Sequence, residues 1–292
     1  MILLTGATGS LGSALLPRLV AEGERVRCLV RDPRRLGPER VRVQIALGDL
    51  SDPASFRNAL RGVKTVIHLA AAIRDQPRAS IEELNAVATL RLLRAAERSG
   101  VEQFVFFSAL GASLHERARF FRAKALAEQA VEDSSLEATI FAPSIVYSPR
   151  DPWIRLIERM SLLPVMPISG SGKARYQPIW ADDAAAAVMG ALDGRGDGRD
   201  RFELAGPDTL SYDDMARETL YALRRRRRLL HVPLPLVRRG LRALESVSGH
   251  GAFAVWEEAE LMEIPMTTAR GTADTEELGV RPRRMREVLR EG

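Results

Sequence analysis

The sequence is poor in cysteine, in lysine and in long apolar runs. Its 292 residues include one cysteine, Cys28, so no internal disulfide can form, and we interpret Cys28 as a packing residue of a strand. No apolar run approaches the roughly 18 residues of a membrane-spanning helix, and the sequence offers no metal-ligand pattern, so we predict no metal. The first strand-like run begins at Met1, which leaves no room for a signal or transit peptide, and we expect a cytoplasmic protein.

The basic residues are almost all arginine. Three lysines, Lys64, Lys124 and Lys173, stand among 43 basic residues, and the remaining 40 arginines are spread over the chain to give a net charge of +5. Residues 224–228 are five consecutive arginines without the interleaved aromatic residues of a nucleic-acid stacking platform. We interpret this run as a solvated helix end, which makes RNA or other nucleic acid the weakest partner hypothesis.

Strand-like and helical runs alternate through the first half of the chain. We predict strands at residues 2–4, 26–30, 41–47, 65–69, 104–107 and 138–141, and helices at 11–21, 54–60, 81–99 and 117–131. Such alternation is typical of parallel strands joined by crossover helices on both faces. The predicted fold class is therefore α/β, a doubly wound parallel sheet of the Rossmann type.

The alternation of strand-like and helical runs ends beyond Pro143. Prolines at 149, 152, 164 and 167 and a Gly-Ser stretch at 169–172 break the alternation, which predicts a smaller lobe. We predict that residues 1–150 form the dinucleotide-binding domain, with 174–205 partly returning to it. The smaller, discontinuous C-terminal substrate lobe is predicted at 151–173 and 206–292.

A glycine-spaced turn follows the first predicted strand. Gly6, Gly9 and Gly12 lie where the chain leaves a strand, turns without side-chain obstruction and begins a helix. The free N–H groups of such a helix end bind a pyrophosphate. We therefore predict a dinucleotide site whose first segment comprises Gly6, Thr8, Gly9, Ser10, Leu11 and Gly12.

The end of the second predicted strand favours NADP(H) over NAD(H). An NAD-binding protein of this type carries a ribose-binding carboxylate there, but this chain has Val30, followed by Arg31, Arg34 and Arg35. A guanidinium suits a phosphate dianion. We assign Arg31 alone to the extra phosphate and interpret Asp32 as the cap of a turn at Pro33, while Arg34 and Arg35 have the alternative interpretation of ordinary solvated charge in a loop.

Two further segments follow predicted strands at the edge where open sheets bind ligands. Asp49 and Leu50 close the third strand and are expected beside the adenine. Ala70, Ala71 and Ala72 follow the fourth strand and offer small residues over which a cofactor can lie, although small residues there also suit helix packing.

Several motifs resemble the extended or atypical short-chain dehydrogenases/reductases over nearly the whole chain. They are Thr5–Gly12, Asn85 and residues 66–71, 106–111, 142–147 and 177–183. Within that superfamily, residues 108–112, 202–207 and 210–215 are most similar to the branch that contains the 39-kDa-type accessory subunit of respiratory complex I. Bacterial members of that branch bind NAD(P)H and include proteins with suspected quinone-related roles.

The resemblance also places the catalytic positions and finds them altered. Active members carry a tyrosine four residues before a lysine, but here Phe120 precedes Lys124, and a benzene ring has no proton to give. Ala109 stands where a supporting serine or threonine is usual. The resemblance implies that Lys124 binds the nicotinamide ribose, that Ser108 contributes to the cofactor site and that Pro143 and Ser144 bracket the nicotinamide.

Other titratable residues admit two readings. His115 lies between Ala109 and Phe120 and is the one replacement acid that we consider, although its loop position favours exposure. His68 ends a buried strand, where we expect a structural histidine rather than a base. Asp182 and Asp183 precede a helical run and are interpreted as an N-cap with helix-dipole stabilisation.

Two features of the predicted lobe indicate which ligands or surfaces it could contact. Tyr147, Trp153, Tyr176 and Trp180 are expected to form core or to line an apolar pocket. Residues 232–244 resemble an amphipathic helix with a basic face, which either packs on the lobe or rests on an anionic membrane.

Two function hypotheses follow from these readings. The first is an NADP(H)-dependent oxidoreductase that reduces a hydrophobic, quinone-like substrate and, in one variant of the hypothesis, is peripheral to the membrane. The second is a catalytically inactive protein that holds NADPH as a structural or sensing ligand and acts through protein contacts in a complex.

Overall fold

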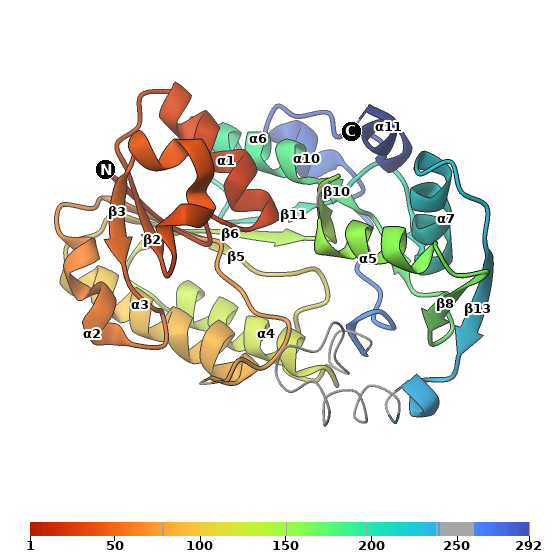
Figure 1. The fold of residues 1–292 in the computed structure, drawn as a ribbon. Coiled ribbons are helices and arrows are strands. Elements are labelled where there is room, and N and C mark those ends of the chain that lie inside the picture. The colour runs from red at the N-terminus through yellow and green to blue at the C-terminus, as the bar shows by residue number, and fades with distance from the viewer. Residues whose placement is uncertain (78, 150, 197, 238, 240–259, 292) are drawn as a thin grey trace.

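The computed structural model describes residues 1–77, 79–149, 151–196, 198–237, 239 and 260–291. Its centre is a seven-stranded sheet in the order β11-β6-β5-β4-β1-β2-β3, and every neighbouring pair is parallel (Figure 1). The strands are β1 (Ile2–Thr5), β2 (Val26–Val30), β3 (Gln44–Leu47), β4 (Thr65–His68), β5 (Gln103–Phe107), β6 (Glu137–Pro143) and β11 (Arg201–Leu204). The predicted doubly wound parallel sheet is confirmed.

Helices cover both faces of this sheet and bury a separate apolar core on each (Figure 1). On one face lie α1 (Ser10–Ala21) and α6 (Ala181–Leu192), which pack on each other. The other face carries α2 (Pro53–Phe56) with the 3-10 turn Arg57–Leu60, α3 (Ala88–Arg98) and α4 (Arg119–Glu132). Leu3, Phe104 and Phe106 lie in the second core, and Leu4, Val105 and Phe107 in the first, because neighbouring side chains of a strand point to opposite faces.

One predicted strand begins later than expected, and one predicted helix contains an irregular turn. The strand predicted at 41–47 begins only at Gln44, because Pro33–Val41 forms 3-10 turns kinked at Gly37, whose φ is +63°. Asp32 caps these turns by accepting from the Arg34 N–H at 3.0 Å, as predicted. The helix predicted at 81–99 contains a π turn, Glu83–Val87, before α3.

Segments late in the sequence return to the sheet. The strand β11 pairs with β6, and α6 packs on α1. The short helix α10 (Ala273–Glu277) packs on β11, where the fully buried carboxylate of Asp274 accepts the Glu203 N–H at 2.8 Å and bonds the Arg199 guanidinium at 3.0 Å.

The second lobe lies beside the carboxyl end of the sheet (Figure 1). It contains α5 (Pro152–Met160), β8 (Val165–Ser169), α7 (Tyr212–Ala222), β13 (Arg228–Val232) and α11 (Met285–Glu291). Small two-stranded sheets join β7 (Val146–Tyr147) to β10 (Ile179–Trp180) and β9 (Arg175–Tyr176) to β12 (Leu210–Ser211). The elements of this lobe therefore come from separate stretches of the sequence.

The aromatic residues of the lobe and Cys28 are packing residues. Tyr147 and Tyr176 are buried in the lobe core, and the Trp153 Nε1–H donates to the Tyr212 hydroxyl at 3.1 Å. Cys28 is fully buried in the main core, and this burial raises the pKa of its thiol to about 12. Each of these residues therefore fits the packing interpretation made from the sequence.

The predicted amphipathic helix at 232–244 lies in part, at residues 238 and 240–244, outside the described residues. Within the described part of the chain, no helix combines the length and apolarity needed to cross a membrane.

Candidate functional site, a dinucleotide cleft

The three glycines of the β1–α1 turn lie in different surroundings. Gly6 has φ +73°, and a Cβ there would lie 2.6 Å from the Ala70 nitrogen. A Cβ on Gly12 would lie 2.2 Å from the Gly6 carbonyl oxygen, so the first turn of α1 can pack on the loop only with glycine at that position. At Gly9 a Cβ would meet only that same oxygen, at 3.4 Å, and this glycine lines the adjoining cleft. The turn is thus packed tightly behind and open in front, which suits backbone contact with a pyrophosphate.

This turn forms one wall of a cleft of about 630 Å³ at the carboxyl ends of β1, β2, β3 and β4. The predicted cofactor residues that line it are Gly6, Thr8, Gly9, Arg31, Asp49, Leu50, Ala70, Ala71 and Ala72. Ser10, Leu11, Gly12, Ser108, Lys124, Pro143 and Ser144 do not line it. Sequence reasoning missed Ala7, Leu29, Ile73, Arg74, Gln76 and Leu84, and the only signal for 73–76 was that they continue the Ala70–Ala72 run.

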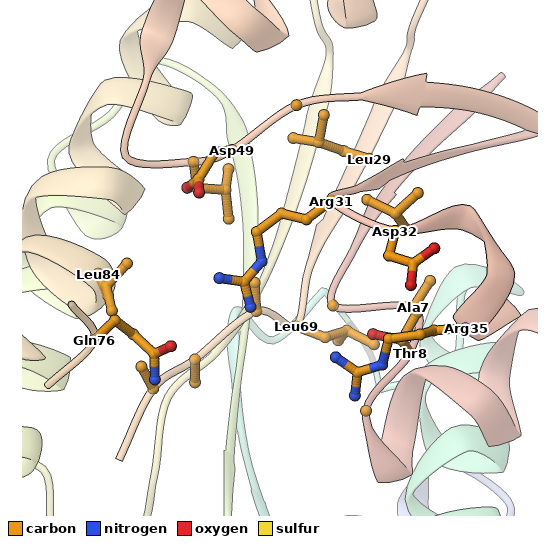
Figure 2. Close-up of a pocket in the computed structure, with 18 of the residues that line it drawn as sticks. Ala7, Thr8, Leu29, Arg31, Asp32, Arg35, Asp49, Leu69, Gln76 and Leu84 are labelled. Carbon is orange, nitrogen blue, oxygen red and sulfur yellow. The ribbon is translucent and has the colours of Figure 1, made fainter. Parts of the chain in front are cut away.

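Two guanidinium groups extend into the cleft from the segment after β2. Figure 2 shows the side chains of Arg31 and Arg35 reaching inward, with Asp49 across the cleft and Thr8 near Arg35. Both arginines are exposed to solvent. The carboxylate of Asp32, which also lines the cleft, is engaged as the cap of the following turns, and that of Asp49 accepts both the N–H and the hydroxyl of Ser51 at 2.9 Å. The two arginines thus present positive charge where the carboxylates are already hydrogen-bonded.

A chain of buried hydrogen bonds supports the floor of the cleft. Thr89 donates to the Asn85 carbonyl at 2.6 Å, so His68 Nε2 donates to Thr89 at 2.9 Å and His68 Nδ1 accepts from Thr5 at 2.7 Å. His68 is fully buried, and desolvation, reinforced by the charge of Lys124, lowers its pKa to about 3. The neutral, fully bonded ring confirms a structural histidine.

Asn85 fixes the loop that follows β4. Its side-chain amide pairs with the backbone of Ala72 in both directions, accepting the Ala72 N–H at 3.1 Å and donating to the Ala72 carbonyl at 2.7 Å, and it also donates to Ile81. Asn85 lies within the π turn Glu83–Val87, and its side chain is almost fully buried. The irregular turn therefore places an amide that holds the Ala70–Ala72 wall of the cleft in position.

Lys124 is buried rather than exposed. Its Nζ donates to the Phe107 carbonyl at 2.6 Å and lies 4.9 Å from the centre of the Phe106 ring and 5.9 Å from that of Phe120. Burial lowers the pKa of this ammonium to about 7, against the smaller opposing influence of Glu128. The lysine is therefore held at the carboxyl end of β5 by a carbonyl and two aromatic rings.

The hydroxyls of Ser108 and Ser144 are engaged within the protein. Ser108 donates to Glu128 at 2.8 Å, and Glu128 also accepts from Arg201 Nε at 2.7 Å. Ser144 donates to the Met266 carbonyl at 2.7 Å and accepts the Gln177 N–H at 3.0 Å. In this arrangement each hydroxyl already donates its proton to an acceptor within the protein.

An apolar cluster contains Ala109 and Phe120, the two positions at which the family resemblance leads one to expect hydroxyl groups. Ala109 packs in it with Ala118, Phe121 and Leu261, and its rim is Phe120, Met262, Ile264 and Met266. Two hydrogen bonds hold the segment 261–266 against β9. The Tyr176 hydroxyl donates to the Met262 carbonyl at 2.7 Å, and the Met266 N–H donates to the Arg175 carbonyl at 2.9 Å. The sequence analysis missed this segment, although its apolar residues were a signal.

The remaining titratable candidates lie away from the cleft. His115 is exposed, as its loop position predicted, and does not line the cleft. The N-cap interpretation of Asp182 and Asp183 was wrong, because Trp180 is the N-cap of α6 and both carboxylates lie in its first turn. Asp183 instead accepts the Arg283 N–H at 2.7 Å, and burial raises its pKa. The helix-dipole part of that interpretation is consistent with these positions.

Comparison with known proteins agrees with this geometry. A family profile described as NAD(P)H-binding matches residues 6–161. The chain is 30% identical over 247 residues to the mitochondrial NADH dehydrogenase [ubiquinone] 1 alpha subcomplex subunit 9 of Arabidopsis thaliana, a match that covers 80% of this chain and 60% of the relative. It is 29% identical over 191 residues to the ceramide reductase of Caulobacter vibrioides, covering 65% of this chain and 60% of that protein.

Solved structures repeat the fold. The crystal structure of a nucleoside-diphosphate-sugar epimerase from Staphylococcus aureus superposes with a TM-score of 0.79 at 18% identity, over 99% of each chain. The two relatives named above are longer, so this chain spans about 60% of their length. On the family match, the glycine turn and the parallel sheet, the chain belongs to the NAD(P)H-binding family, with the architecture of the extended short-chain dehydrogenases/reductases.

Proposed function

We propose that this chain binds NADPH in preference to NADH and uses it to reduce a hydrophobic, quinone-like small molecule. The observation that carries the cofactor preference is the pair of guanidinium groups, Arg31 and Arg35, in the cleft directly after β2. The usual ribose-binding carboxylate is replaced by Val30. A phosphate on the ribose gains charge-assisted hydrogen bonds from such groups, whereas a bare hydroxyl gains little.

The residues that line the cleft fit the adenosine and pyrophosphate part of a dinucleotide. The N–H groups at the start of α1 would hold the pyrophosphate, because Gly9 leaves them open to the cleft. Asp49 and Leu50 would lie beside the adenine, and Ala70–Ala72 would let the cofactor pass over the sheet edge. By resemblance, Lys124 would bind the nicotinamide ribose. When bound, NADPH supplies a hydride.

The nature of the acceptor follows from the missing proton donor. Phe120 cannot donate a proton, and the Lys124 ammonium donates to the Phe107 carbonyl. A quinone can take a hydride and obtain its proton from water or remain anionic for a time, so it does not need a fixed tyrosine. The apolar cluster that includes Phe120 and Met262 favours a hydrophobic acceptor. Because such acceptors dissolve in membranes, we propose that this protein is cytoplasmic and works at a membrane surface or in a protein complex.

A second candidate is a protein that holds NADPH without turning it over. Ala109 and Phe120 lack both usual hydroxyls, and the Ser144 hydroxyl is engaged by Met266 and Gln177. These contacts favour a rigid nicotinamide end over a reactive one. The protein would then act as a structural or sensing subunit through its protein contacts.

A paired titration tests both candidates. Purified protein is titrated with NADPH and with NADH while its thermal stability is followed, and NADPH oxidation is then measured with a soluble quinone. Arg31→Gln is expected to weaken NADPH binding by about 10- to 100-fold and to leave NADH binding nearly unchanged. Arg40→Gln, an exposed arginine outside the cleft, is the matched control.

Each outcome of that experiment separates the candidates. Selective NADPH binding with quinone-dependent oxidation supports the reductase. Selective binding without oxidation across a panel of quinones and carbonyls supports the structural or sensing protein. Equal affinity for the two nucleotides, or an Arg31→Gln protein that binds like its parent, contradicts the cofactor preference.

A further inference from the structure

The arginine run at 224–228 is divided by the fold into two sets. Arg225 and Arg227 turn inward: Arg225 donates to the Glu158 carbonyl at 3.0 Å, and Arg227 Nε donates to the Ser161 carbonyl at 2.8 Å. Both carbonyls belong to the last turn and the C-terminal end of α5, where the helix dipole attracts positive charge. This half of the run is structural.

The alternate arginines, Arg224, Arg226 and Arg228, are exposed. Arg224 lies in the turn that follows α7, with a φ of +54°, and its N–H donates to the Tyr221 carbonyl. Beyond this turn the backbone extends into β13, which begins at Arg228, and neighbouring side chains point to opposite sides. The prediction of a solvated helix end needs refinement, because α7 ends at Ala222 and the run leads into a strand. Three guanidinium groups therefore face solvent from one short stretch.

Exposed leucines lie next to the segment that contains the arginine run. Leu162 is 70% exposed and Leu163 is 49% exposed, and both directly follow the carbonyl that Arg227 bonds. Val165 pairs with Arg228 and Pro167 with Leu230 across the parallel β8–β13 ladder, which places Leu230, 53% exposed, on the same outer face. The opposite face carries Met166 and its neighbours into the lobe core. The outer face is apolar and basic.

We call the surface formed by residues 161–167 and 224–232 the β8–β13 tip. It lies at the end of the molecule farthest from β3 in Figure 1. Its two stretches contain five arginines and no carboxylate. The described acidic groups next to it include Glu158 in α5 and Asp213 in α7, and Asp213 accepts from His231 Nε2 at 2.9 Å. Among the residues that the structure describes, Arg224, Arg226 and Arg228 form no ion pair with a carboxylate, so the tip combines exposed leucines with positive charge.

We infer that the β8–β13 tip binds the surface of an anionic lipid bilayer. Guanidinium groups are attracted to anionic headgroups, and the adjacent leucines gain free energy by leaving water at the headgroup boundary. A single-stranded RNA would use the arginines but not the leucines, and the tip contains no phenylalanine, tyrosine or tryptophan for stacking. The inference deepens the membrane association in the proposed function by naming its surface and the lipid charge that the surface requires.

The test is co-sedimentation of the full chain with vesicles, without nucleotide. The parent protein is expected to sediment with phosphatidylcholine vesicles that contain about a third phosphatidylglycerol and to stay in solution with phosphatidylcholine alone. The double variant R226Q/R228Q is expected to lower the partition coefficient by about 25-fold, roughly fivefold for each arginine. L162S/L163S is expected to lower it by about tenfold or more.

Control variants keep the result interpretable. V41S/L47S removes two exposed apolar side chains, 81% and 64% exposed, near the opposite edge of the sheet and is expected to bind like the parent. The four substituted tip residues are exposed, and circular dichroism checks that each variant folds. Because nucleotide is absent, failure of lipid binding leaves the NADPH titration as a separate result.

Three outcomes overturn the inference. One is vesicle binding that does not depend on phosphatidylglycerol. Another is binding that both tip variants retain, which would place the contact elsewhere on the chain. The third is absent vesicle binding together with salt-sensitive binding of a labelled single-stranded RNA, which would assign the arginines to nucleic acid.

Discussion

Replacing Lys124 with methionine should remove a specific part of the protein's pH-dependent stability. The ammonium of Lys124 is almost fully buried, and it donates a hydrogen bond to the Phe107 carbonyl at 2.6 Å. Methionine retains most of the apolar stem between the Phe106 and Phe120 rings and deletes the titrating group. The substitution therefore isolates the cost of burying the charge.

The sign and size follow from the pKa. Burial lowers the pKa of Lys124 from 10.5 to about 7, so between these values the unfolded chain binds nearly one more proton than the folded protein. The free energy of unfolding must then rise with pH across this window, by up to about 1.4 kcal/mol per pH unit from this group. Between pH 7.5 and 9.5 the contribution is about 2 kcal/mol. His68, with a pKa of about 3, adds the same sign only at lower pH.

The assay is urea unfolding of both proteins at pH 7.5 and 9.5 at constant ionic strength. The Phe107 carbonyl loses its donor in the variant, which costs free energy at both pH values, so the slope with pH is the diagnostic quantity. We expect the variant's free energy of unfolding to gain about 2 kcal/mol less than the parent's over this interval. Lys64→Met is the control, because the Lys64 side chain is 67% exposed and faces Glu102 at 3.0 Å.

Two results would refute the reasoning. If the Lys124→Met protein has the same pH slope as its parent, the ammonium is not desolvated in the folded state. If Lys64→Met flattens the slope equally, the effect belongs to net charge and not to burial.

Three further predictions concern the cleft and its surroundings. Gly12→Ala should destabilise the nucleotide-free protein, because its Cβ would lie 2.2 Å from a loop carbonyl, whereas Gly9→Ala should fold normally and lose nucleotide affinity; thermal melts with and without NADPH distinguish them, and equal melts would contradict the assignment. Glu82 accepts two hydrogen bonds from Arg119, and these bonds are the main reason why its pKa falls from 4.5 to about 2. The contribution of Glu82 to the stability of the fold is therefore complete above pH 4.5 and is lost as the pH falls toward 2. Glu82→Gln should therefore flatten the acid limb of the stability curve, and an unchanged acid midpoint would count against this pair. Phe120→Tyr should introduce NADPH-dependent reduction of a simple ketone above the parent's background, because the Lys124 ammonium lies 5.9 Å from that ring; no gain would mean that the alignment of this position is wrong or that the ketone cannot enter.

Local patterns in the sequence were enough to predict the central fold. Alternating runs gave the strands of the sheet, and the predicted strand 26–30 coincides with β2. The stretch before β3 was mispredicted, because the turns there depend on Pro33, Pro38 and a left-handed Gly37 rather than on apolar periodicity. The cleft-lining residues predicted best were those that directly follow strands, since parallel strands end at one edge of a sheet.

What the sequence by itself determined is the parallel sheet, the glycine turn and the arginines after β2, because each depends on residues close together in the chain. Only the tertiary structure decided which side chains are free to act. It buried Lys124, bonded Ser144 to the carbonyl of Met266, 122 residues away, and separated Arg225 from Arg226 by turning one toward α5. Such outcomes depend on hydrogen-bond partners and desolvation from distant segments, and a residue's local pattern contains no record of them.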